Sequence, residues 1–132
     1  MGCSRTQGRR QKEKEDKEMY QRSEDCPRED KKVHGGNGFG HMKVLATPDQ
    51  MYGNARLFNH ATLDPGCSFG YHPHEHETEF YYILSGEAIF NDNGTEVVLH
   101  AGDIAETGGG ASHSLENRGD VPVELIALIV NE

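Results

Sequence analysis

The sequence contains no tryptophan, only three cysteines and no long uninterrupted apolar run. Its most apolar stretch, residues 121–130, includes a proline and a glutamate, whereas a membrane-spanning helix needs roughly 18 or more consecutive apolar residues. We therefore expect no membrane partner. Three cysteines make no even disulfide framework, and the N-terminus lacks the apolar segment of a secretory signal, so we expect a cytoplasmic protein.

Positively charged residues are scarce outside the N-terminal segment. Residues 1–32 carry ten Lys and Arg against eight Asp and Glu, whereas residues 33–132 carry three against fourteen, a net charge of −11. Such an acidic surface repels phosphate backbones, so the composition argues against a nucleic-acid partner. A bound cation is the natural exception.

The chain of 132 residues divides by composition near residue 33. Residues 1–32 are nearly all polar or charged and have little apolar surface to bury, which predicts a disordered or partly helical tail. Residues 33–132 are long enough for a single barrel domain around one core.

From Lys43 onward, short β-rich runs alternate with turn residues, which is typical of a sandwich or barrel. The Asn-Gly pair at 93–94 indicates a hairpin, because both residue types accept the positive φ angles of a type I′ turn. The sequence therefore predicts an all-β fold. The expected strands are residues 43–46, 54–63, 67–72, 79–85, 87–91, 96–100, 104–107, 113–117 and 123–130.

Three histidines lie in the stretch His-Pro-His-Glu-His at 72–76. Residues two apart in an extended strand face the same side, so His72 and His74 present their imidazoles to one point. Pro73 biases His72 toward the extended conformation. Glu79 begins the next expected strand after a short turn, which can bring a carboxylate to the two imidazoles.

This spacing resembles that of the cupin superfamily. The first cupin motif is glycine, five residues, histidine, one residue, histidine, three or four residues, glutamate, six residues and glycine. Its positions are met by Gly66, His72, His74, Glu79 and Gly86. The second motif is met by Gly102, Gly110, His113 and Asn117, with Gly108 where the family has proline. The resemblance covers nearly all of residues 35–132 and implies a double-stranded β-helix, or jelly-roll, barrel.

By the same resemblance, His72, His74, Glu79 and His113 are the ligands of one divalent transition metal ion. Three neutral imidazoles and a carboxylate suit Mn, Fe, Ni, Co or Zn and leave coordination positions for water or substrate. The lack of a cysteine ligand argues against a closed structural zinc site. The alternative is an ordinary histidine-rich surface loop, but such a loop does not explain His113 and Asn117 at the expected offset.

Four further residues are candidates for substrate contact or proton transfer. Tyr81 shares the strand face of Glu79 and can orient a substrate or donate a proton, unless it is an ordinary core tyrosine. His76 lies in a turn, where an acid–base role at the pocket rim competes with plain solvent exposure. Arg56 and His60 share a strand face; if it points inward they can bind a substrate carboxylate, and if outward Arg56 forms a surface salt bridge.

The resemblance leaves the reaction open, because small cupins include dioxygenases, decarboxylases, isomerases and binding proteins without turnover. We expect a metal-dependent enzyme that acts on a small oxygen-rich molecule, such as a carboxylate, an enol or a diketone, by dioxygenase-, decarboxylase- or isomerase-type chemistry. Sugar phosphates are less attractive, because the barrel offers only three cationic side chains. The alternative is a non-catalytic, metal-dependent binding or sensory module.

Two expected strands are apolar on both faces, which predicts a homodimer. In residues 79–85 and 123–130, apolar side chains leave on both sides, whereas a lone barrel should alternate apolar with polar residues. A second chain would cover the outer side chains by pairing about a two-fold axis. A segment of the same chain around residues 33–45 is the alternative cover.

Overall fold

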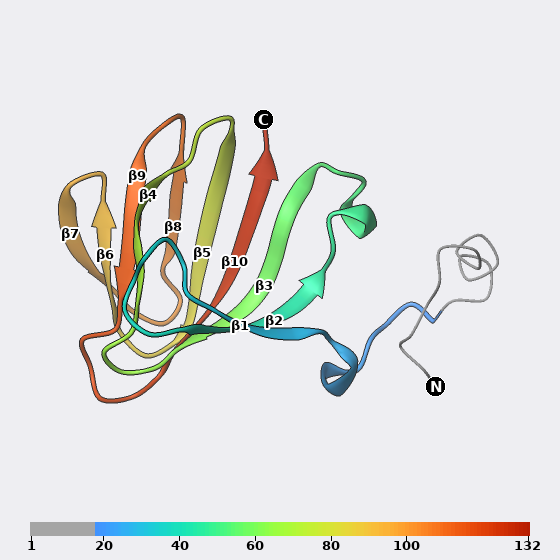
Figure 1. Cartoon of the computed structure of the whole chain (residues 1–132), viewed down its shortest axis with the longest axis horizontal. Coiled ribbons are helices and arrows are strands. Elements are labelled where there is room, and N and C mark those ends of the chain that lie inside the picture. The colour runs from blue at the N-terminus through green and yellow to red at the C-terminus, as the bar shows by residue number, and fades with distance from the viewer. Residues whose placement is uncertain (1–17) are drawn as a thin grey trace.

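The computed structural model describes residues 18–132, which form two antiparallel β-sheets around one core (Figure 1). One sheet has the strand order β1-β2-β3-β10-β5-β8 and the other β4-β9-β6-β7. The strands are β1 (Arg28–Lys31), β2 (Gly40–Ala46), β3 (Ala55–Leu63), β4 (Ser68–Pro73), β5 (Glu77–Ser85), β6 (Ala88–Asp92), β7 (Thr95–Leu99), β8 (Ile104–Gly108), β9 (Ser112–Glu116) and β10 (Val123–Asn131). No helix among these residues has the length and apolar character needed to cross a membrane. The predicted all-β double-stranded β-helix is confirmed.

All nine strands expected from the sequence are present, with ends that agree to within three residues. The structure adds β1, which pairs with β2 and lies in the segment expected to be a tail. All four β1 residues are exposed, so backbone pairing holds this strand and burial does not. Residues 1–17 lie outside the described residues, and the domain boundary near residue 33 stays a prediction.

The core lies between the two sheets. Strand β10 alternates regularly, with Val123, Leu125, Ala127 and Ile129 buried and the residues between them partly exposed. Apolar side chains of the four-stranded sheet pack against this row from the other side. Burial of each large aliphatic side chain contributes roughly 1.5–3 kcal/mol. The core therefore fixes the distance between the sheets, and with it the separation of any residues that meet between them.

Asn117, the last residue of the second motif, fixes the loop after β9. Its side-chain amide donates to the carbonyl oxygens of Leu63 at 2.9 Å and Val121 at 2.8 Å, and its Oδ1 accepts from the Gly119 N–H at 2.9 Å. The residue is 1% exposed. A buried carbonyl left without its donor costs about 1–3 kcal/mol. Asn117 is thus a structural residue that ties the loop to the end of β3.

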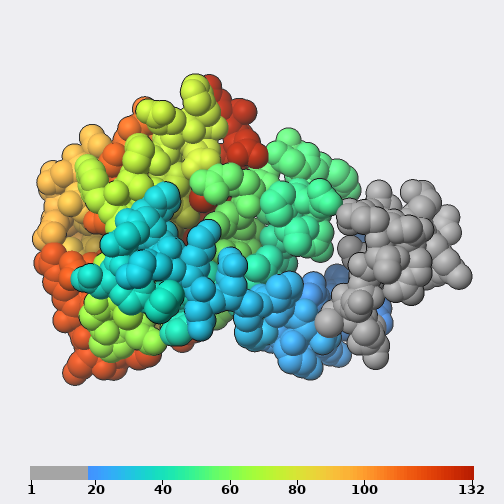
Figure 2. Space-filling model, in the orientation of Figure 1, coloured from blue at the N-terminus to red at the C-terminus, as the bar shows by residue number. Residues whose placement is uncertain are grey.

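Residues 33–37 run along the edge of β4, and Figure 2 shows this cyan N-terminal segment lying against the barrel. The Val33 carbonyl accepts from the Gly70 N–H at 2.9 Å, and the Asn37 carbonyl accepts from the Ser68 N–H at 2.9 Å. A side chain at position 70 would not fit, because its Cβ would lie 2.0 Å from the carbonyl oxygen of His34. The segment covers a sheet edge that would otherwise be open and holds His34 beside β4.

An outer apolar row crosses the exposed face of the six-stranded sheet. Its members are Phe58, Phe80, Tyr82, Leu84, Ile104, Ile126 and Leu128. Tyr82, Leu84 and Ile104 are 44%, 41% and 65% exposed. Residues 33–45 do not cover the row, because residues 33–37 lie along β4 and β2 extends the sheet by pairing with β3. Within residues 18–132, the outer apolar row remains accessible.

Candidate metal centre

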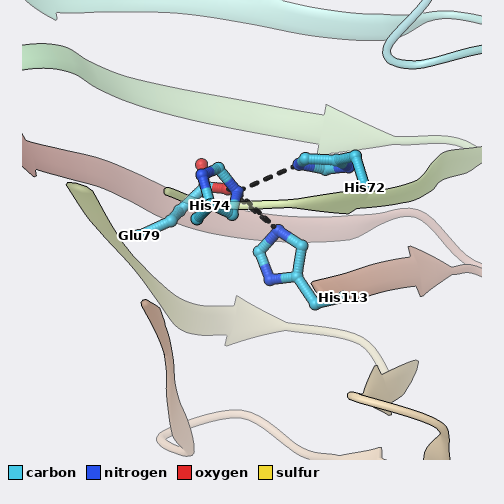
Figure 3. Close-up of side chains that lie close together, drawn as sticks. All are labelled: His72, His74, Glu79 and His113. Carbon is cyan, nitrogen blue, oxygen red and sulfur yellow. Dashed lines mark hydrogen bonds and ion pairs between the residues drawn. The ribbon is translucent and has the colours of Figure 1, made fainter. Parts of the chain in front are cut away.

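Four buried side chains converge between the two sheets (Figure 3). His72 belongs to β4, Glu79 to β5 and His113 to β9, while His74 directly follows β4. His72 and His113 are cross-strand neighbours in the β4–β9 pair. One potential ligand atom from each residue lies within 4.8 Å of the other three. The structure thus brings together the four residues that the sequence motifs singled out.

The loop between β8 and β9 holds His74 in place. The His74 N–H donates to the Ala111 carbonyl at 3.0 Å, and the Gly110 N–H donates to the His74 carbonyl at 2.8 Å. These two bonds continue the β4–β9 pairing past Pro73, where β4 ends. His74 therefore keeps a fixed backbone position although it lies outside a strand.

Each of the three imidazoles uses its Nδ1 atom to contact a fixed group outside the cluster. The contacts are His72 Nδ1 to the Gly70 carbonyl at 2.6 Å, His74 Nδ1 to Glu77 Oε2 at 2.5 Å and His113 Nδ1 to Thr107 Oγ1 at 2.8 Å. A carbonyl or a carboxylate only accepts, so neutral His72 and His74 carry their proton on Nδ1. Their Nε2 atoms then present lone pairs to the centre of the cluster.

Those lone pairs face one another at short distances. His74 Nε2 lies 3.0 Å from the Nε2 atoms of both His72 and His113. Glu79 Oε1 lies 2.9 Å from His74 Nε2 and 3.1 Å from His113 Nε2. Two acceptor atoms do not bond one another, so each of these close contacts needs a shared proton or a metal ion between its two atoms. Adjacent ligands about 2.1 Å from an octahedrally coordinated ion are about 3.0 Å apart, which matches these separations.

The protein environment shifts the pKa values of His72 and His74 in opposite directions. Burial lowers the pKa of His72 to about 4, against the opposing hydrogen bond to Gly70. The hydrogen bond to Glu79 raises the pKa of His74, with burial opposing it and Glu77 adding to it. Burial pushes the pKa of Glu79 upward, but hydrogen bonds from His113 and His74 outweigh it and the net pKa is lowered. In metal-free protein, His74 is therefore favoured over His72 as the site of a proton.

Arg56 is linked to the cluster through Glu77. Its Nε donates to Glu77 Oε1 at 2.6 Å and its Nη2 donates to Glu77 Oε2 at 2.8 Å. The Arg56 guanidinium is the main cause that lowers the pKa of Glu77 to about 2, against some burial. Arg56, a sequence candidate for a substrate carboxylate, is thus engaged by a carboxylate of its own chain.

Tyr81 lies in the interior beside the cluster, on the same face of β5 as Glu79. Its hydroxyl is 3.4 Å from His113 Nε2, and its ring stacks with the His113 ring at a centroid distance of 4.9 Å. Burial, together with the negative charge of Glu79, raises the pKa of Tyr81 well above its usual value. The hydroxyl therefore keeps its proton at neutral pH.

His76 and His60 lie away from the cluster. His76 occupies the turn between β4 and β5, where its side chain is 88% exposed and faces Glu132 Oε1 at 3.5 Å. His60 lies on the outer face of β3, because alternate residues of that strand point into the barrel, and it contacts Glu124 at 2.9 Å. Neither side chain meets the four converging donors.

His34 is a neighbour of the cluster that the sequence patterns did not indicate. Its ring stacks on the His72 ring with a centroid distance of 3.7 Å and an interplanar angle of 13°. His34 is exposed and His72 is buried, so His34 covers the cluster on its solvent side. The contact depends on residues 33–37 running along β4, a pairing that no motif spacing reports.

Comparisons with known proteins agree with this fold. Residues 59–129 match the model of the Cupin domain family. An oxalate-binding protein of Thermotoga maritima is 44% identical over 108 residues, which cover 82% of this chain and 89% of that protein. A crystal structure of a predicted oxalate decarboxylase from Thermotoga maritima has a TM-score of 0.82 and 43% identity, covering 86% of this chain and 100% of that chain. The tetracenomycin polyketide synthase protein TcmJ of Streptomyces glaucescens is 30% identical over 66% of this chain, and the match spans 58% of TcmJ.

In metal-free protein, we expect the His72 imidazole to titrate near pH 4. Its folded-state pKa lies below the unfolded value of 6.5, so the unfolded chain binds this proton more readily. The contribution of neutral His72 to stability is therefore complete above pH 6.5 and is lost as the pH falls toward 4. NMR titration of the histidine Cε1–H resonances measures the midpoint. His41, whose pKa Asp30 and Asp64 raise by hydrogen bonding, should titrate above 6.5 in the same spectra, and a His72 midpoint near that of His41 would contradict the assignment.

Proposed function

This chain belongs to the cupin family, and we propose that it binds a small carboxylate, with oxalate as the model ligand, through a divalent metal ion. We assign His72, His74, Glu79 and His113 as the metal ligands. One observation carries this proposal. Three Nε2 atoms and one carboxylate oxygen meet at a buried point, while every Nδ1 of the three imidazoles is already engaged elsewhere.

The donor set suits Mn, Fe, Co, Ni or Zn, and we propose one ion per chain. Four protein ligands would leave coordination positions for water or for ligand oxygen atoms. When bound, such an ion supplies a Lewis acid for the oxygen atoms of the carboxylate. The Nδ1 contacts orient the rings in advance, so less conformational freedom is lost when the ion binds.

The charge distribution favours a small anion held directly at the metal. Glu79 is the one carboxylate of the cluster, so a divalent ion leaves a net charge of about +1 there. The rest of residues 33–132 is strongly acidic and would repel an extended anion. The Thermotoga maritima relative, which matches over most of both chains, is an oxalate-binding protein.

Turnover of the carboxylate is a second candidate, and the buried Tyr81 hydroxyl favours it. Conversion of the oxalate monoanion to formate and carbon dioxide requires a proton to replace the carboxyl group that leaves a carbon atom. Tyr81 keeps its proton at neutral pH and lies 3.4 Å from His113 Nε2. It is therefore our candidate proton donor for such a reaction.

The outer apolar row supports a homodimer. A contiguous apolar patch of this kind is unusual on the surface of a soluble monomer. The segment of the same chain that was the alternative cover lies elsewhere, along β4 and in β2. We propose that two chains pair through this face about a two-fold axis.

Replacing any one of His72, His74, Glu79 or His113 by alanine should lower metal affinity by at least about tenfold, because each change removes a donor from the ion. Inductively coupled plasma mass spectrometry after dialysis measures the metal content of each variant. His76→Ala is the matched control and should retain the wild-type content, since its side chain is 88% exposed on the turn. Full occupancy in His113→Ala would show that this residue is not a ligand.

Oxalate should bind the metal-loaded protein with one site per ion and should not bind the chelator-treated protein, because the acidic domain offers an anion little attraction without the ion. Isothermal titration calorimetry measures both states, with malonate and pyruvate as comparison ligands.

Formate and carbon dioxide are then assayed over several hours. Formate production by the metal-loaded wild-type protein would establish turnover. Loss of formate production in Tyr81→Phe, with oxalate binding retained, would support Tyr81 as the proton donor. Binding that is equal with and without metal would contradict the proposed function.

Light scattering at micromolar concentration should report about twice the chain mass of 14.7 kDa. Ile104→Lys should shift the protein toward the monomer, because it places a charge in the outer apolar row. Val98→Lys changes a residue that is 46% exposed on the other sheet and should leave the dimer intact. A wild-type monomer mass would refute the pairing.

A further inference from the structure

We infer that Glu77, held by Arg56, is a positioning residue for His74 as a metal ligand. This inference rests on the proposed metal site. Neither residue touches the point where the four donors converge, so their action is through the His74 ring. The sequence motifs single out neither residue for this role.

The Glu77 carboxylate contacts both partners at once. Its Oε2 accepts from His74 Nδ1 at 2.5 Å and from Arg56 Nη2 at 2.8 Å, and its Oε1 accepts from Arg56 Nε at 2.6 Å. The Glu77 side chain is only 13% exposed, whereas that of Arg56 is 48% exposed. A continuous chain of charge-assisted hydrogen bonds thus runs from a solvent-accessible guanidinium to a buried imidazole.

Arg56 lies at a register shift between β3 and β10. The register between β3 and β10 shifts between Ile129 and Val130, which pair with Leu57 and Ala55 and leave Arg56 without a partner on β10. The Arg56 side chain is exposed between the more buried Ala55 and Leu57, and it reaches Glu77 at the beginning of β5.

His74 is the only one of the three imidazoles in the cluster whose Nδ1 contacts a charged acceptor. His72 and His113 contact a backbone carbonyl and a hydroxyl oxygen. A carboxylate on Nδ1 holds the proton there, fixes the ring orientation and makes Nε2 a stronger donor to a metal ion. Arg56 occupies both oxygen atoms of Glu77 and so prevents the carboxylate from rotating away. Disturbing this pair should therefore weaken the metal site through His74 alone.

The test is a competition between the full-length protein and a chelator for Zn²⁺. Glu77→Gln should weaken Zn²⁺ binding by about 10- to 100-fold. Arg56→Met should weaken it by a smaller factor, and Arg56→Lys should restore part of that loss because it keeps one positive donor. In the Glu77→Gln background, Arg56→Met should have no further effect, since Arg56 acts only through Glu77.

Arg118→Met is the matched control. Arg118 makes a similar two-bond contact with Glu96, at 3.2 and 2.8 Å, and its side chain is 49% exposed. It lies outside the cluster, so its removal should leave Zn²⁺ affinity at the wild-type value. Thermal melts of all variants show whether each one folds. The Arg56 variants provide the result if Glu77→Gln does not fold, because Arg56 is half exposed.

Long-range ¹H–¹⁵N spectra of the Zn²⁺-loaded protein add a readout that a merely structural role would not move. The His74 Nδ1–H resonance should shift upfield in Glu77→Gln and to a lesser extent in Arg56→Met, while the corresponding His72 resonance stays in place. Wild-type Zn²⁺ affinity and an unshifted His74 signal in Glu77→Gln would overturn the inference and leave the proposed function intact. Additive effects of the two substitutions would overturn the role of Arg56. A wild-type protein that binds no metal would overturn both the inference and the proposed function.

Discussion

Four potential metal-ligand atoms held around one buried point are the constraint on which the site depends. Acceptor atoms that face one another out of water are unfavourable unless a shared proton or a metal ion lies between them. The backbone pairing around the four residues prevents their side chains from moving apart. His72 and His113 are fixed by the β4–β9 pair, Glu79 by β5, and His74 by two backbone bonds to the β8–β9 loop. The barrel thus holds the four side chains in a close arrangement that they would not keep in a flexible chain.

Local regularities explain how much was predictable from sequence. Strand periodicity and turn residues located nine strands, and motif spacing located four residues that the fold brings together. Strand β1 was not predicted, because all its residues are exposed and its pairing therefore produces no apolar pattern in the sequence. Arg56 was grouped with His60 by alternation, and that pattern does not report its pairing with Glu77, which lies 21 residues away. His34 reaches His72 through a pairing that depends on the folded barrel.

The acidic composition of the barrel determines how it could attract a carboxylate. A strongly acidic barrel offers little attraction to an anion, and two of its three cationic side chains are paired with its own carboxylates, Arg56 with Glu77 and Arg118 with Glu96. In this arrangement a divalent ion would be the main source of attraction for a carboxylate. The Thermotoga maritima protein to which this chain is similar is an oxalate-binding protein.

The segment of residues 33–37 along β4 links the position of His34 to the protection of a strand edge. Its hydrogen bonds carry His34 onto His72, and they also occupy the edge of the strand that bears His72. If the segment detached, that edge would become a template for strand addition by another molecule, with aggregation as the result. A side chain at Gly70, whose Cβ would lie 2.0 Å from the His34 carbonyl oxygen, would force this separation. A substitution at position 70 would therefore disturb the protected strand edge and the His34–His72 contact together.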